Sequence, residues 1–112
     1  MKRSDSLKRK KEFRYTYRAG KSQSNKLCAL VYARNRVGAV RIGFSVSKKI
    51  GNSVARNRTK RRMREAITPL IPGIRKGFNI IIIAREAIVE APFADIRAAM
   101  RLLLERASLT DK

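Results

Sequence analysis

The residues with the clearest chemical character lie between Ser45 and Ile67, where the chain reads SVSKKIGNSVARNRTKRRMREAI. Eight of the seventeen positions from Lys48 to Arg64 are Lys or Arg. A solvated helix face normally mixes both signs of charge, but the only acid here is Glu65, and like charges three or four residues apart repel each other. The segment therefore predicts a helix that binds a polyanion.

Projection at 3.6 residues per turn separates the side chains that pack from those that bind. The predicted packing stripe is small and apolar: Ala55, Thr59, Met63, Ala66 and Leu70. The predicted binding surface carries one amide and six cations: Arg56, Asn57, Arg58, Lys60, Arg61, Arg62 and Arg64. Gly51 permits a sharp turn, and Asn52 or Ser53 can cap the helix. Its free N–H groups, beside Lys48 and Lys49, suit a phosphate, although the cap alone is equally consistent with a structural role.

The composition of the chain limits the classes of partner that it can bind. The 112 residues carry 28 Lys and Arg against 8 Asp and Glu, a net charge of +20, which favours nucleic acid or an anionic membrane. The apolar run Ile80–Ala84 is far too short to span a bilayer, and no apolar segment follows the basic residues 1–11 as in a signal peptide. We therefore expect a cytoplasmic protein that binds nucleic acid and no membrane.

The residue types that are absent argue against catalysis by this chain. It has no histidine, which excludes Ser–His and Cys–His nucleophiles and His-ligated zinc. The eight acids are scattered, with no paired spacing for a two-metal nuclease. Cys28, the only cysteine, lies in an apolar stretch and is expected in the core. We therefore predict no catalytic residue, no metal site and no cofactor bound by the protein alone.

The 44% of hydrophobic residues is enough for one domain spanning residues 1–112 without disulfides or metal. Residues 1–6 are polar and expected to be disordered, or to fold on binding. A helix is predicted over 8–19, ended by Gly20 as the residue that follows its C-terminus. On it, Phe13 and Tyr17 lie one turn apart, and either anchor the helix to a core or stack on bases.

The rest of the chain predicts a small α+β two-layer sandwich, in the order α-β-β-(β)-α-β-α. Strands are predicted over 27–33 and 39–47, joined by a hairpin loop at 34–38. The four isoleucines within 78–85 indicate a strand buried on both faces, so strand, basic helix and strand form a βαβ unit. A final helix over 91–107, with Pro92 in its first turn, covers the sheet with a predicted stripe of Phe93, Ile96, Met100, Leu103 and Ala107.

The run from Ser45 to Ile67 closely resembles the signature of the bacterial ribonuclease P protein subunit, S-x-S-K-K followed by a helix with R-N-R-x-K-R-x-x-R-E. The matching positions are Ser45, Ser47, Lys48, Lys49, Arg56, Asn57, Arg58, Lys60, Arg61, Arg64 and Glu65. Leu7-Lys8, Phe13, Arg41-Ile42-Gly43, the isoleucine strand and the closing helix follow in family order. The resemblance therefore covers nearly the whole chain.

The resemblance implies a protein that assists the catalytic RNA of ribonuclease P in removing the 5′ leader of precursor tRNA, with magnesium bound by that RNA. It implies that the basic surface, including Lys48, Lys49 and Arg62, binds the catalytic RNA. It also implies that a cleft between the first helix and the sheet holds the leader on Phe13, Tyr17, Tyr32, Phe44 and Lys48. Tyr17 stands where the family often has Phe, and the register around Tyr32 decides whether it faces this cleft. The family's βαβ crossover is left-handed, against the general rule.

Two other functions fit the same composition. A ribosomal or other RNA-scaffolding protein also explains +20 on a small α+β fold. A magnesium-dependent nuclease acting alone would cut without added RNA. Ribonuclease P RNA and precursor tRNA are the expected partners, and no obligatory protein partner is evident in the sequence.

Overall fold

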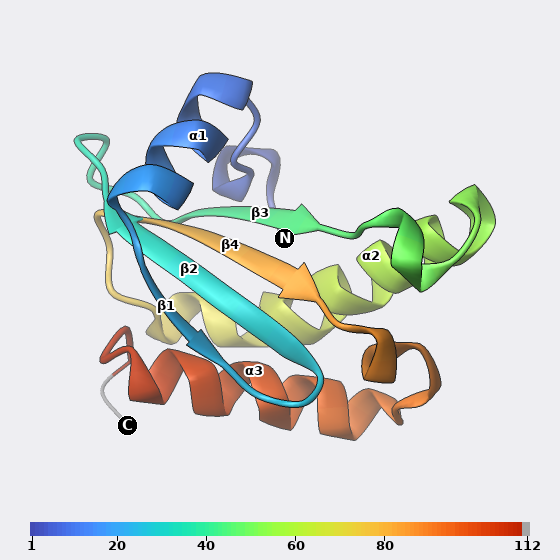
Figure 1. Cartoon of the computed structure of the whole chain (residues 1–112). Coiled ribbons are helices and arrows are strands. Elements are labelled where there is room, and N and C mark those ends of the chain that lie inside the picture. The colour runs from blue at the N-terminus through green and yellow to red at the C-terminus, as the bar shows by residue number, and fades with distance from the viewer. Residues whose placement is uncertain (111–112) are drawn as a thin grey trace.

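The computed structural model describes residues 1–110, which form three α-helices and one four-stranded sheet (Figure 1). In chain order these elements are α1 (Lys10–Ala19), β1 (Lys21–Ser24), β2 (Cys28–Arg34), β3 (Arg41–Ser45), α2 (Ser53–Ile67), β4 (Phe78–Ala84) and α3 (Phe93–Arg106). Short 3-10 turns occupy Arg3–Asp5, Lys48–Ile50, Thr68–Gly73 and Glu86–Glu90. The α+β fold predicted from the sequence is confirmed, with β1 as the additional strand that the predicted order allowed.

The sheet has the strand order β1-β2-β4-β3, with β4 in its interior. β4 pairs antiparallel with β2 and parallel with β3, so β3, α2 and β4 form the predicted βαβ unit. The predicted hairpin between β2 and β3 is wrong, because β4 lies between them and β2 forms its hairpin with β1 instead. The run Ile80–Ile82 is fully buried, and a strand that is apolar on both faces is stable only inside a covered sheet.

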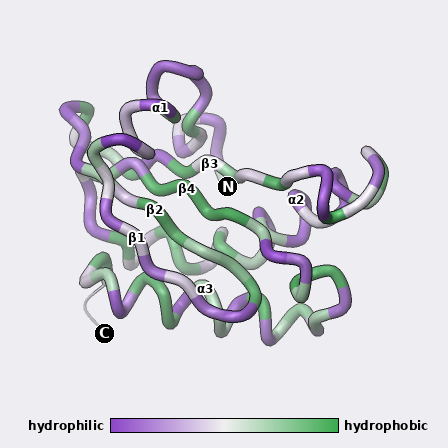
Figure 2. Tube along the Cα trace, in the orientation of Figure 1, coloured by the Kyte–Doolittle hydropathy of each residue, from purple (hydrophilic) through white to green (hydrophobic). Residues whose placement is uncertain are grey.

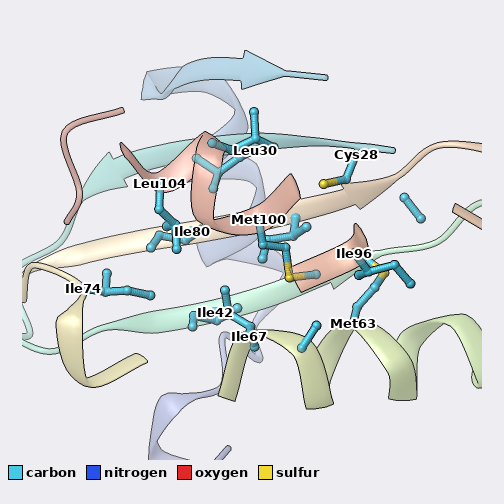
Figure 3. Packing of buried hydrophobic residues seen from close by; sticks show 14 of the residues in the cluster. Cys28, Leu30, Ile42, Met63, Ile67, Ile74, Ile80, Ile96, Met100 and Leu104 are labelled. Atoms are coloured by element: carbon cyan, nitrogen blue, oxygen red, sulfur yellow. The ribbon is translucent and has the colours of Figure 1, made fainter. Parts of the chain in front are cut away.

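α2 and α3 cover one face of the sheet and enclose the main core with it. Met63 and Ile67 of α2 and Ile96, Met100 and Leu104 of α3 converge over sheet residues that include Leu30, Ile42 and Ile80 (Figure 3). Cys28 lies in this core with no exposed surface, and burial raises the pKa of its thiol to about 11. The thiol is therefore protonated at neutral pH, as expected for a small core side chain.

α1 lies on part of the opposite face (Figure 1), where Gly43 makes room for it. A Cβ at Gly43 would come within 2.4 Å of the Phe13 ring, so the close approach of helix and strand requires glycine here. Buried Thr16 of α1 accepts a hydrogen bond of 3.1 Å from the amide of Asn79 in β4. Figure 2 shows α1 as mostly hydrophilic and β4 as mostly hydrophobic, which matches a short helix held by few side chains.

Three local details differ from the predictions or add to them. Arg3–Asp5 form a 3-10 turn and Ser6 bridges Ile42, because edge strand β3 offers free backbone groups there. α1 ends at Gly20 as predicted; the backbone there is extended with φ of −83°, and a Cβ would lie 2.3 Å from the carbonyl oxygen of Thr16. Phe93 is exposed rather than in the packing stripe, and its ring carries the guanidinium of Arg97 at 5.1 Å.

Candidate nucleic-acid interface

The outer face of α2 presents the predicted cations to solvent. Thr59, Met63 and Ala66 are buried as predicted, and Ile67 joins them, while Ala55 and Leu70 are half-buried. Of the predicted binding residues, the exposed ones are Asn57, Arg58, Arg61 and Arg64, and the half-buried ones are Arg56, Lys60 and Arg62. Packing therefore fixes one side of this helix and leaves a cationic surface on the other.

The start of α2 is capped as predicted, by Asn52 rather than Ser53. The Asn52 side chain accepts a hydrogen bond of 2.9 Å from the backbone N–H of Ala55, and Gly51 has a φ of 146° that favours glycine. Lys48 and Lys49 lie in the 3-10 turn before this cap, and both are exposed. Two cations thus stand near the positive end of the helix dipole, where an anion is stabilised.

Arg62 differs from its neighbours on α2. Its guanidinium donates a hydrogen bond of 2.6 Å to the carbonyl oxygen of Ala91 and a longer one of 3.5 Å to that of Val89. These bonds tie α2 to the end of the 3-10 turn Glu86–Glu90 and to Ala91, which follows it. Arg62 therefore has a structural role that the helical projection did not indicate.

Phe13 and Tyr17 lie side by side on α1 and border a hollow of about 530 Å³ together with Lys8, Lys10 and Arg14. Tyr17 is 46% exposed, so its ring is accessible to a base, whereas Phe13 is half-buried against Gly43. Of the two alternatives open from the sequence, core anchor or stacking platform, Phe13 fits the first and Tyr17 the second.

Phe44 and Phe13 both border a smaller hollow of about 150 Å³ at the outer edge of β3. Lys60 and Arg64 of α2 border it too, and the Arg64 guanidinium lies 6.0 Å from the centre of the Phe44 ring. Phe44 pairs with Ile82 and packs on the side of the main core, so it meets Phe13 only at this edge and does not line the cleft predicted on the α1 side. Lys48 follows β3 in the 3-10 turn at the far end of the strand.

Tyr32 does not join this group, so the sequence prediction for it is wrong. Tyr32 pairs with Ile80 and packs on the side of the main core, with its ring 6.4 Å from that of Phe78. The neighbouring Val31 pairs with Ile81, which pairs with Gly43 on the side of α1. Because side chains alternate along a strand, a shift of one residue moves Tyr32 to the opposite face.

Several residues near α1 were missed from the sequence. Ala29, Val31 and Ile83 lie on the α1 side of the sheet and are only half-buried, so this part of the sheet is not fully covered. The signal that could have found the cations beside Phe13 and Tyr17 is the alternation of basic and aromatic residues over 8–18, which is typical of surfaces for single-stranded nucleic acid.

Among residues 1–110, no three His, Cys, Asp or Glu side chains gather closely enough to hold a metal ion. None of the helices in the described part of the chain is long and apolar enough to cross a bilayer.

Comparison with known proteins shows to which family a chain with this fold and this basic helix belongs. The family model described as ribonuclease P matches residues 1–108. The chain belongs to the bacterial ribonuclease P protein family. Curated ribonuclease P protein components include one from Symbiobacterium thermophilum, 37% identical over 100% of this chain and 98% of the relative, and one from Thermoanaerobacter sp., 43% identical over 92% and 89%.

Solved structures of ribonuclease P proteins have the same fold. The protein from Staphylococcus aureus superposes with a TM-score of 0.86 at 30% identity, over 96% of this chain and 98% of the other. That from Thermotoga maritima gives 0.82 at 28% identity, over 90% and 96%. Family membership makes the chain the protein component of an endoribonuclease that works with ribonuclease P RNA.

Proposed function

We propose that the exposed face of α2 binds the catalytic RNA, whereas α1 and the adjoining part of the sheet bind the 5′ leader of precursor tRNA. The observation that carries this proposal is the separation of two surfaces of different chemistry. One is almost purely cationic. The other places the exposed ring of Tyr17 among Lys8, Lys10 and Arg14.

The cations of α2 suit a folded RNA. Lys48, Lys49, Arg58, Arg61 and Arg64 are exposed, and Glu65 is the only acid on the helix. Such cations neutralise phosphates that a compact RNA crowds together, and the counterions they release make binding depend steeply on salt. In this proposal the RNA binds the magnesium and performs hydrolysis, and the protein lowers the magnesium concentration that the RNA needs.

The aromatic hollow suits a single strand. Bases stack on exposed rings with little sequence preference, at roughly 1–3 kcal/mol per base. Mature tRNA lacks a leader, so contacts in this hollow favour precursor over product. Lys48 extends the surface beyond β3, and Val31 takes the place on the α1 side that Tyr32 does not occupy. We propose that leader removal takes place in the cytoplasm, where precursor tRNA is made.

The test is a reconstituted holoenzyme carrying Tyr17→Ala, with Tyr17→Phe as the matched control that keeps the ring. We expect Tyr17→Ala to bind precursor tRNA several-fold more weakly and mature tRNA as before, with the control close to the unmodified protein. Equal weakening of precursor and mature tRNA by a folded Tyr17→Ala protein would place the leader elsewhere.

Two controls separate the competing functions. The purified protein alone should cleave precursor tRNA no faster than buffer, whereas a solitary nuclease would cut it. A ribosomal scaffolding protein would not lower the magnesium requirement of ribonuclease P RNA, so a reconstitution in which that requirement falls contradicts the scaffolding alternative.

A further inference from the structure

A second and larger hollow, of about 780 Å³, lies on the other flank of α1 and is lined by this helix and by the loop that joins β2 to β3. Six cations line it: Arg9, Lys11, Arg14, Arg18, Arg34 and Arg36. The other lining residues are Glu12, Tyr15, Asn35, Val37 and Asn79. No residue of this hollow, which we call the α1–loop groove, belongs to the surfaces assigned above except Arg14.

The α1–loop groove has a fixed floor. Asn79, 4% exposed, is the one polar side chain within the isoleucine strand β4. Its amide donates to Thr16 of α1 at 3.1 Å, and its carbonyl oxygen accepts from the Asn35 amide of the loop at 3.0 Å. Asn35 in turn accepts from the backbone N–H groups of Val37 and Gly38. This chain of bonds sets the distance between the helix and the loop.

The two walls of the groove are also joined directly. The Tyr15 hydroxyl donates a hydrogen bond of 2.9 Å to the carbonyl oxygen of Arg34, so the ring stands across the groove and remains 38% exposed. The Arg34 guanidinium lies 5.5 Å from the centre of the Phe78 ring. The groove is therefore a built feature, with an aromatic ring held among cations.

The charge of the groove is not compensated from within. Glu12 is the only acid that lines it, and one of its carboxylate oxygens already accepts from the backbone N–H of Arg9 at the start of α1. A surface that serves solubility alone would mix both signs. The guanidinium of Arg34 lies over the Phe78 ring, and the five other cations around one acid indicate an anionic occupant that relieves their mutual repulsion.

We propose that the α1–loop groove binds single-stranded RNA, and that this RNA is the upstream part of the 5′ leader. A cationic groove with an accessible aromatic ring is the usual platform for a single strand. Arg14 borders both this groove and the Tyr17 hollow, so the two surfaces are continuous over the outer side of α1. The strand has to cross only one helix, roughly 10–12 Å wide with its side chains.

The inference rests on the proposed function, since it extends the leader path beyond Tyr17. It predicts that the groove matters only when the leader is long enough to reach it. The test compares precursor tRNA carrying a leader of a few nucleotides with one whose leader is several times longer, each titrated with reconstituted holoenzyme.

The variant is Arg18→Gln with Arg36→Gln, because both side chains are exposed. The matched control is Arg101→Gln with Arg106→Gln, which removes the same charge from exposed positions on α3, across the sheet. We expect the groove variant to bind the long-leader precursor several-fold more weakly, with a salt slope lower by about 0.7 for each phosphate that the protein no longer neutralises. The short-leader precursor and the control variant should show neither change.

The outcomes separate this inference from the proposed function. Equal affinity of the groove variant and the unmodified protein for the long-leader precursor would overturn the inference, while Tyr17→Ala would still test the leader hollow. Weaker binding of the catalytic RNA alone, with no dependence on leader length, would also overturn it, because the occupant would then be that RNA. If Tyr17→Ala has no effect but the groove variant does, the leader hollow fails and the groove remains.

Discussion

α2 and α3 pack on the same face of the sheet, yet their outer sides differ. Each helix buries a stripe in one common core, with Met63 and Ile67 from α2 and Met100 and Leu104 from α3. The outer side of α2 carries six cations and one acid, whereas α3 carries Arg97, Arg101 and Arg106 together with Asp95 and Glu105. The same packing therefore supports two different surfaces.

This difference shows which constraint acts on which residues. Burial dictates the inner stripe of both helices, because apolar side chains there are removed from water. It says nothing about the outer sides, where mixed charges are the ordinary solution for solubility. The unmixed charge of α2 therefore reflects a partner, and α3 provides the internal control for every test of it.

The largest effect on stability is expected at buried positions, where α2 and α3 are alike. Met63→Ala and Met100→Ala each empty a fully buried position, and each should lower the free energy of unfolding by about 2–5 kcal/mol. Chemical denaturation measures both. The RNA affinity of the folded variants should stay unchanged. A large loss of stability for only one of them would show that the buried faces of α2 and α3 do not contribute equally to the core.

A smaller effect is expected where a cation of α2 is structural. Arg62→Gln removes the charged donor to the carbonyl oxygen of Ala91, and should cost about 1.5 kcal/mol, the lower end for such a bond because the site is only partly buried. Arg61→Gln, at an exposed position, should stay within about 0.5 kcal/mol of the unmodified protein. Thermal or chemical unfolding of the two variants side by side checks this, and equal stability would remove the structural role of Arg62.

The smallest effect on stability is expected from the residue that caps the N-terminus of α2. α2 is capped by the side chain of Asn52, whereas Pro92 at the same place on α3 makes no side-chain hydrogen bond. Asn52→Ala should therefore cost about 1 kcal/mol of unfolding free energy, and Asn52→Gly only a few tenths. Chemical denaturation that finds Asn52→Ala as stable as the unmodified protein would show that the hydrogen bond to Ala55 contributes little.

Much of the fold is readable from the sequence because its periodicities are strong. The isoleucine run predicts a buried strand, and the basic helix and closing helix follow from their stripes. The predicted order allows one more strand, but the sequence does not locate β1, because Lys21–Ser24 is polar and mostly exposed at the sheet edge, where packing selects few residues. The pairing of β2 with β4 is not predicted, because the loop at 34–38 resembles a hairpin loop, whereas β4 follows β2 more than forty residues later in the chain.

The sequence likewise predicts some parts of the candidate interface and not others. The cationic side of α2 is local, so helical projection finds it, except that the hydrogen bonds of Arg62 to Val89 and Ala91 are tertiary. The side of Tyr32 depends on a register that alternates with every residue. The α1–loop groove joins two segments some twenty residues apart, and the hydrogen bonds of Asn79 and Tyr15 bring them together.

The most direct test of the central claim compares the outer sides of α2 and α3 in one binding experiment. Affinity for ribonuclease P RNA is measured over a range of salt for Arg61→Gln with Arg64→Gln on α2, and for Arg101→Gln with Arg106→Gln on α3. We predict weaker binding for the α2 variant, with a salt slope lower by about 0.7–0.9 for each phosphate left without its cation, and no change for the α3 variant. Equal affinity and slope for the two folded variants would contradict the assignment of α2 as the surface that binds the catalytic RNA.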